Sequence, residues 1–336
     1  MKPDYYRNKW KSWVAEKSAG SDEEIRHFAI KIALSFLDSY YYNDAFTYDY
    51  IDLLCEMATS EDPKARSAAG SALFGGIIEG LCDDFEELQT EAYSRVMSYI
   101  ISYCSQIPEG REIGKKLASF GLQSFDDIFH RIERIRRNSI SKRELGHPKK
   151  LIFLSRVTIG ADVAVTSVLV SRFSAMFPEA EIVIIGDNKL SSLFGGNPKI
   201  RIRKLKYVRH GELLERISSW LEVLETIEEE TSPVNNGAYL LVDGDSRLSQ
   251  LGVLPLVEEK MYLYFNSRGK DEYPKKISMA ELSNFWVDKI IGTSSFEYPR
   301  IWIPENLLNS AYKFISKIKK TGCKNIIFIN LGVGGN

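Results

Sequence analysis

The chain has 336 residues, of which 44% are hydrophobic, 12% aromatic and 26% charged, and its formal net charge is −1 at pH 7. This composition and length are typical of a folded globular protein with two domains, and they exclude disorder as the main feature. A net charge so close to zero argues against duplex nucleic acid as the main partner, because nucleic-acid-binding domains are basic.

Cysteine usage and the start of the chain bear on location. Cys55, Cys82, Cys104 and Cys323 form no CxxC pair, and no charged segment precedes an apolar one at the start, so structural zinc and secretion both lose support. No run of about 18 apolar residues occurs, the length that a membrane-spanning helix needs. We therefore expect a cytoplasmic protein that is at most peripheral to a membrane.

The first half of the chain, residues 1–147, is predicted to be all-helical. Its apolar residues recur at spacings of three and four, which indicates helices over 22–42, 48–59, 62–81, 85–106, 109–120 and 124–137. The last of these opens on Ser124 with Asp127 three residues later, a capping-box-like start with Asp in place of Glu. Because no clean repeat occurs, the pattern favours a bundle of helix hairpins over a short solenoid.

A basic segment separates the two halves. Residues 131–150 contain eight basic side chains, namely Arg131, Arg134, Arg136, Arg137, Lys142, Arg143, Lys149 and Lys150. We interpret the segment as a solvated helix face followed by a linker, with a phosphate or anionic-lipid patch as the alternative. Pro148 marks the boundary, so we expect residues 1–147 to fold as a separate unit.

From residue 150 onward, short apolar runs alternate with helical stretches. Strands are predicted over 151–154, 181–185, 199–205, 238–242 and 261–265, and helices over 162–176, 190–194, 211–230 and 278–290. A helix over 304–320 and a strand over 325–329 end the pattern. Continuous apolar runs indicate parallel strands buried on both faces, so the predicted fold class is an α/β Rossmann-like parallel sheet domain preceded by an all-α domain.

Polar residues that follow the predicted strands are the candidates for a site, because open parallel sheets bind ligands beyond the carboxyl ends of their strands. They are Arg156, Gly160 and Asp162 after the first strand, Asp243, Asp245, Ser246 and Arg247 after the fourth, and Arg268 after the fifth. The first turn has only Gly160 where GxGxxG needs three glycines, which argues against a dinucleotide. None of the four histidines accompanies a nucleophile signature.

Two interpretations stay open for these side chains. Asp162 is either a helix cap or a general base that takes a proton from an acceptor hydroxyl. Arg247 and Arg268 either bind an anion or form ion pairs with Asp243 or Asp245. The sequence Asp243-Gly-Asp245 has the DxD form of a metal-binding loop, but we interpret it as part of an acceptor-side loop and expect no metal.

Four segments in the second half resemble glycosyltransferase family nine, the heptosyltransferase-like enzymes of bacterial surface polysaccharide synthesis. They are LIFLSRVTIGADVAVTSV at 151–168, FPEAEIVIIG at 177–186, LFGGNP at 193–198 and NLGVGGN at 330–336. The resemblance covers about residues 149–336 and leaves the helical half unexplained. It implies a GT-B fold, no cofactor and no metal, and inverting transfer of a heptose-like sugar from a nucleotide sugar to a saccharide acceptor, as in lipopolysaccharide biosynthesis.

The resemblance also implies roles for individual residues. Asp162 is implied as the catalytic base, with Ala161 inserted between Gly160 and Asp162 and with Thr166 at its family spacing. The implied acceptor-binding residues are Arg156, Gly160, Thr166, Asp243, Asp245, Ser246, Arg247 and Arg268. The implied donor phosphate-binding residues are Gly332, Gly334, Gly335 and Asn336. Peripheral contact with the inner membrane surface is a further expectation.

The domain expectation follows from the same resemblance. Residues 148–302 are expected to form the acceptor-side Rossmann-like domain, and residues 303–336 a linker helix and the first strand of a second such domain that holds the donor. A chain that stops at residue 336 is then a fragment, and we expect it to have no transferase activity as given. The alternative is a non-catalytic helical scaffold joined to an α/β module that binds a sugar or a protein.

Overall fold

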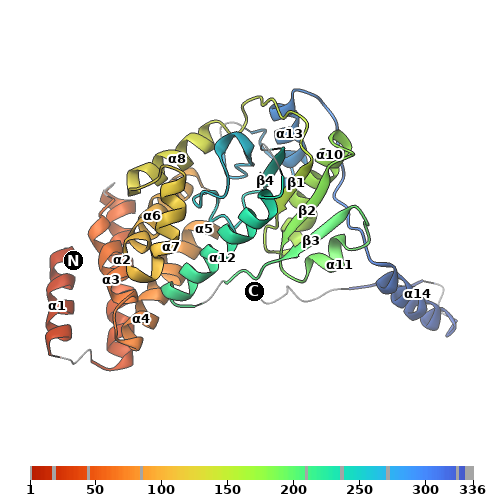
Figure 1. Ribbon diagram of the computed structural model, residues 1–336. Coiled ribbons are helices and arrows are strands. Elements are labelled where there is room, and N and C mark those ends of the chain that lie inside the picture. Colours follow the sequence, from red (N-terminus) through yellow and green to blue (C-terminus); the bar gives the residue numbers. More distant parts are fainter. Residues whose placement is uncertain are drawn as a thin grey trace.

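The structure is a computed structural model, and it describes residues 2–16, 20–43, 46–83, 86–208, 211–234, 238–269, 273–322 and 325–329. The first half is helical, as predicted (Figure 1). Its elements are α1 (Pro3–Ala15), α2 (Asp22–Asn43), α3 (Tyr48–Ala58), α4 (Pro63–Gly70), the π-helix η1 (Ser71–Ile78), α5 (Glu79–Asp83), α6 (Glu87–Gln106), the 3-10 helix η2 (Pro108–Gly110), α7 (Arg111–Ser119) and α8 (Phe125–Arg137).

Local chemistry accounts for two helix starts in this half. Helix α1, which the periodicity did not predict, has Pro3 at its first position, where the fixed φ of proline suits a helix. At the start of α8 the predicted capping box is confirmed. Asp127 N donates to Ser124 Oγ at 3.2 Å, and Ser124 N donates to Asp127 Oδ2 at 2.9 Å.

The second half contains a five-stranded, all-parallel sheet flanked by helices, so the α/β class is confirmed. The strands are β1 (Lys150–Leu154), β2 (Glu181–Gly186), β3 (Ile200–Lys204), β4 (Tyr239–Asp243) and β5 (Tyr262–Tyr264). The helical segments are α9 (Ile159–Ala161), the π-helix η3 (Asp162–Thr166), α10 (Ser167–Met176), α11 (Leu190–Phe194), α12 (Leu213–Thr231), the 3-10 helix η5 (Glu259–Met261), α13 (Met279–Ile291) and α14 (Glu305–Lys319).

The strand order creates a topological switch point at the centre of the sheet. In the order β3-β2-β1-β4-β5, strand β1 pairs with both β2 and β4. The chain runs from β1 outward to β3 on one side and then returns to build β4 and β5 on the other. The loops after β1 and β4 therefore leave neighbouring strands at the position where ligands bind in such folds.

The two faces of the sheet belong to two hydrophobic cores. Leu151 and Phe153 of β1 pack with residues of α10 and α13, whereas Ile152 and Leu154 pack with α12 and the helical half. Successive side chains of a strand point to opposite faces, so one strand supplies both cores. Figure 1 shows α12 between the sheet and the helices of the first half.

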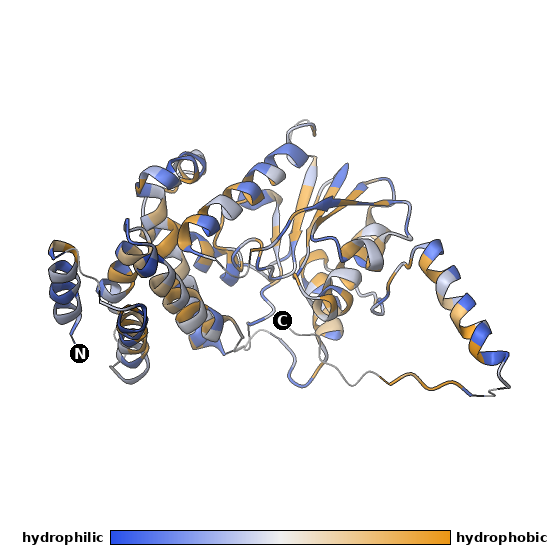
Figure 2. Cartoon of the chain, turned by 90° about the horizontal axis from the view of Figure 1, so that it is seen from below, coloured by the Kyte–Doolittle hydropathy of each residue, from blue (hydrophilic) through white to orange (hydrophobic). Residues whose placement is uncertain are grey.

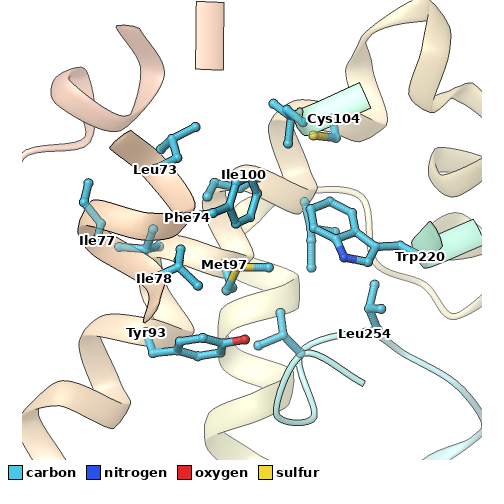
Figure 3. Close-up of a cluster of buried hydrophobic side chains, with 14 of the residues drawn as sticks. Leu73, Phe74, Ile77, Ile78, Tyr93, Met97, Ile100, Cys104, Trp220 and Leu254 are labelled. Carbon is cyan, nitrogen blue, oxygen red and sulfur yellow. The ribbon is translucent and has the colours of Figure 1, made fainter. Parts of the chain in front are cut away.

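The helical half and the sheet share a continuous core. In Figure 3, Phe74 of η1, Met97 of α6, Trp220 of α12 and Leu254 of the segment after β4 gather in one cluster. Trp220 is 2% exposed and Leu254 is fully buried. The first half thus packs its apolar surface against the second, and separate folding of residues 1–147 stays a prediction.

The end of the described chain stands apart from this body. None of the residues of α14 is buried, and Figures 1 and 2 show the helix well clear of the sheet. Residues 325–329, predicted to be a strand, form no strand with any described segment, and Ile327, Phe328 and Ile329 are 82%, 69% and 74% exposed. An apolar run becomes a strand only when a neighbouring backbone pairs with it, and no described segment pairs with this one.

One continuous helix, Ile159–Met176, is long and apolar enough by composition to cross a membrane, but 56% of that window is buried. Its Leu169 and Phe173 lie in the core on one face of the sheet. The helix therefore has the surroundings of a core helix in an α/β fold.

Candidate functional site

The loops after β1 and β4 meet at the switch point, as the positions of their residues predicted. Ser246 Oγ, in the loop after β4, donates a hydrogen bond to the carbonyl oxygen of Ser155, the first residue after β1. A Cβ atom on Gly244 would lie 3.2 Å from Val165 Cγ1, so the β4 loop approaches the helix after β1 closely at this glycine. Arg156 Nη2 lies 3.7 Å from Asp245 Oδ2 and thus joins the two loops electrostatically.

Asp162 lies in η3, is 3% exposed, and accepts three hydrogen bonds. Ser155 Oγ donates to its Oδ2 at 2.7 Å, while Arg156 N and Thr166 Oγ1 donate to its Oδ1 at 2.8 and 2.7 Å. Burial raises the pKa of this carboxyl above its ordinary value, and the three donors offset part of that rise. The carboxylate holds the β1 loop in place. It is not the N-cap of the helix, since that position belongs to Thr158.

Both loops contain strained backbone. Val157 has φ 74°, a region that β-branched residues rarely adopt, and its N–H donates to Ser155 Oγ at 2.9 Å. In the β4 loop, Asp245, Gln250 and Leu251 have φ of 66°, 52° and 53°. Of the five non-glycine residues with positive φ in the described part of the chain, these two loops contain four. Strain of this kind concentrates at functional sites.

Asp245 is the centre of a buried polar cluster. Its Oδ1 accepts from Tyr264 Oη at 2.7 Å, and its Oδ2 accepts from Ser267 Oγ at 2.6 Å and Arg268 Nε at 2.9 Å. Burial raises the pKa of this carboxyl, but the charges of Arg268 and Arg156 and the hydrogen bonds outweigh burial and leave the pKa below its ordinary value. Asp245 is therefore ionised at neutral pH.

Arg268 belongs to the same cluster and reaches the helical half. It is 5% exposed, and its Nη1 donates to the carbonyl oxygen of Cys82 in α5 at 2.6 Å. Of the two interpretations of Arg268, the ion pair with Asp245 is confirmed.

Asp243 is fully buried at the end of β4. Ser246 N donates to its Oδ1 at 2.7 Å and Tyr262 Oη donates to its Oδ2 at 2.5 Å. Burial raises its pKa to about 6, although the hydrogen bonds act in the other direction. All four carboxylate oxygens of Asp243 and Asp245 thus accept protein donors, and no group of three or more His, Cys, Asp or Glu in the described residues is arranged for a metal ion.

The open part of the site is the tip of the β1 loop. Thr158, Ile159 and Gly160 are exposed, and a Cβ atom on Gly160 would meet nothing within 4 Å. The side chain of Arg156 is 9% exposed and Thr166 is 1% exposed. Arg247 is half-buried and lines a small cavity together with Tyr207 and Phe74 of the helical half. Gly332, Gly334, Gly335 and Asn336 lie outside the described residues.

Sequence reasoning missed the tyrosines that hold the two aspartates. Tyr262 and Tyr264 are two residues apart in β5, so their side chains lie on the same face of the sheet. Both are buried, and a buried tyrosine hydroxyl usually has a hydrogen-bond partner, so this spacing was a signal that polar groups lie on that face.

The interpretation of residues 131–150 as a solvated face followed by a linker was wrong for three side chains. Arg131 and Arg136 are 3% and 8% exposed, because α8 packs against α6 and the β4 loop. Lys150, at the start of β1, is 6% exposed and forms an ion pair with Glu230 of α12.

Comparisons with protein-family models, curated proteins and solved structures found no match to the chain. The fold and site define the protein as a helical half packed on an α/β unit with a five-stranded parallel sheet, with the loops after β1 and β4 in contact at its switch point.

Proposed function

We propose that the α/β unit is the acceptor side of an inverting, metal-independent glycosyltransferase of GT-B type. The enzyme transfers a heptose-like sugar from a nucleotide sugar to a saccharide acceptor of a bacterial surface polysaccharide. The observation that carries the proposal is the convergence of Asp162 and Arg156 on the strained loop at the switch point. The motifs that resemble glycosyltransferase family nine support it independently.

In this proposal Asp162 is the general base. The acceptor hydroxyl gives its proton to the carboxylate, its oxygen bonds to the anomeric carbon from the opposite face, and the bond from that carbon to the nucleoside diphosphate breaks with its electron pair. The raised pKa of Asp162 makes the carboxylate a better proton acceptor. Within the described residues, Thr166 Oγ1 donates one hydrogen bond, to Asp162 Oδ1. In this proposal the Thr166 side chain rotates and breaks that bond, and the acceptor hydroxyl then donates to Oδ1 instead.

Arg156 is the candidate for contact with an anionic group on the acceptor. Arg156 and Arg268 both lie next to Asp245, and the charge of Arg156 also acts on the Asp162 carboxylate, so two arginines face two carboxylates. Arg268 is committed to Asp245 and Cys82, whereas Arg156 lies next to the exposed tip of the β1 loop. A carboxylate or phosphate on the acceptor saccharide would pair with Arg156.

The test replaces Asp162 with Asn in the natural protein. Asn keeps the shape, with its amide oxygen accepting from Arg156 N and its amide nitrogen donating to Ser155, so folding is expected to survive. Transfer from ADP-, GDP- and UDP-activated sugars to a lipopolysaccharide core saccharide should fall by about 10²–10⁴-fold, the range for a positioned acid–base group.

The matched control is Asp187→Asn. Asp187 follows the neighbouring strand β2 and accepts a hydrogen bond from Lys189 N at 2.8 Å, so it is a strand-end aspartate outside the switch point. Its variant should keep the full rate. Near wild-type transfer by Asp162→Asn, with unchanged folding, would show that Asp162 only holds the loop.

A non-catalytic binding module is the second candidate, and one observation favours it. Asp243, Asp245 and Arg268 form hydrogen bonds with other protein groups, so much of the polar surface at the strand ends stabilises the fold and does not contact a substrate. This candidate expects saccharide binding in calorimetry with no transfer from any of the three donors, an outcome that would contradict the enzyme.

A further inference from the structure

The segment after β4 is unusual because it is a long loop with almost no exposed surface. Every residue of 243–257 is buried except Arg247, which is half-buried. Loops normally lie at the surface because their backbone polar groups need partners. This one also contains three consecutive residues with positive φ, Gln250, Leu251 and Gly252. A buried segment with such backbone needs contacts from outside itself to stay in place.

Helix α8 supplies one set of these contacts. Arg131 Nη1 donates to the carbonyl oxygen of Gly252 at 3.0 Å, and its guanidinium carbon lies 5.7 Å from the ring centroid of Tyr262. Arg131 forms no salt bridge among the residues that the structure describes, although it is 3% exposed. Burying a guanidinium without a carboxylate is costly, so its contacts to the loop and to Tyr262 must offset that cost.

The tyrosines of β5 extend these contacts to the switch point. Tyr262 Oη donates to Asp243, and Tyr264 Oη lies 2.7 Å from Asp245 Oδ1 and 2.9 Å from the carbonyl oxygen of Leu251. Arg136 of α8 is close enough to Tyr264 to lower the pKa of its phenol, although burial raises that pKa overall. One chain of contacts therefore runs from Arg131 of α8 through Tyr262 to Asp243, and Tyr264 joins Asp245 to the backbone of the loop at Leu251.

A third contact comes from α5. Arg268 links Asp245 to the carbonyl oxygen of Cys82, a residue 186 positions earlier in the sequence. The helical half thus reaches the β4 loop from two helices. Helix α8 contacts the loop at Gly252, and α5 contacts it through Arg268, which pairs with Asp245 next to Arg156.

We propose that the helical half holds the switch-point loops in place. In this proposal Arg131, Tyr262 and Tyr264 are positioning residues that hold the strained loop 243–257 and, through Asp245, the side chain of Arg156; we call this set of contacts the brace. This role stands on the contacts alone and does not depend on the proposal of glycosyl transfer.

The experiment measures amide hydrogen exchange by mass spectrometry in the full chain. Three single variants are compared with the unmodified protein: Arg131→Met, Tyr264→Phe and Tyr99→Phe. Tyr99 is the matched control, because its hydroxyl donates to Asp52 Oδ1 at 3.1 Å within the helical half, away from the loop. Each hydrogen bond to a charged group that is lost should speed exchange in the segment it holds by about 10- to 100-fold.

We expect faster exchange in 244–257 for Arg131→Met and Tyr264→Phe, with β1 and α6 unchanged, and no change in 244–257 for Tyr99→Phe. Unchanged exchange in the loop of both test variants would overturn the brace. A uniform rise over all segments would also overturn it, since that result describes a general loss of stability. If Arg131→Met does not fold, Tyr264→Phe, which removes one oxygen atom, decides the test alone.

Discussion

The loops after β1 and β4 leave neighbouring strands at the same edge of the sheet, but they differ in how much of each is exposed to solvent. The tip of the β1 loop, residues 158–160, is exposed, whereas the β4 loop is buried over almost its whole length. The difference lies in what packs on each loop. Helix α8 contacts the second loop at Gly252, and α5 contacts Arg268, which pairs with Asp245 of that loop. A strand-end position therefore locates a candidate residue, and the neighbouring elements decide whether a ligand can reach it.

The central aspartates of the two loops sharpen this contrast. Asp162 and Asp245 are 3% and 2% exposed, and each accepts three hydrogen bonds. Yet the pKa of Asp162 is raised, chiefly by burial, and that of Asp245 is lowered because two arginines outweigh burial. Local donors hold Asp162, while Asp245 is held by charges from other parts of the fold.

The largest expected effect is that of Asp245→Ala. The substitution leaves Arg268 buried without its carboxylate, which costs about 3–5 kcal/mol in the free energy of unfolding. Asp162→Ala removes only hydrogen bonds near an exposed loop and should cost about 1–3 kcal/mol. Urea unfolding of both variants tests the contrast, and equal losses would contradict it.

Asp243 should make stability depend on pH between about 4 and 6. Its pKa is about 6 in the folded protein, against about 3.9 for an unfolded aspartate, so the folded state holds the extra proton in this range. Stability from this group is present below pH 4 and is lost as pH rises through 6, by about 3 kcal/mol at most. Asp245, whose pKa is lowered, has the opposite sign and loses its contribution at more acidic pH.

The measurement is urea unfolding at several pH values for the unmodified protein and for Asp243→Asn. The difference between the two should fall with rising pH between 4 and 6 and be flat above that range. A difference that does not change with pH would mean that Asp243 titrates normally.

Gly252→Ala should destabilise the buried loop by about 1–3 kcal/mol. Gly252 has φ 86°, and an added Cβ atom would lie 2.9 Å from Ile132 Cδ1 and 3.0 Å from Tyr264 Cε2. Thermal unfolding monitors the loss. Unchanged stability would show that α8 and the loop can move apart at little cost, contrary to the brace.

Gly160→Ala, the matched change in the exposed loop, should have the smallest effect. Gly160 lies in the three-residue helix α9 at the exposed tip of this loop, and its added methyl group would meet nothing within 4 Å. Alanine favours a helix over glycine by about 0.5–1 kcal/mol, so a slight gain in melting temperature is expected. A loss would mean that the β1 loop is packed more tightly than the structure has it.

The sequence by itself determined the features that depend on neighbouring residues. Helix periodicity before residue 147 and apolar runs after it predicted the all-helical half and the parallel sheet, and Ser124 with Asp127 predicted a cap. The strand-end rule brought Asp162 and Asp245 to one edge. Each of these follows from spacing or from local hydrogen bonding, which a single stretch of sequence contains.

Only the tertiary structure decided which of those residues a ligand can reach. It brought Arg268 to Cys82 and Arg131 to Gly252, pairs that are 186 and 121 residues apart, and it buried Arg131 and Arg136 in a segment whose composition indicated a solvated surface. It also left the apolar run at 325–329 without a partner strand among the described residues. Contacts between distant segments depend on how whole helices and strands pack, and no local pattern records that packing.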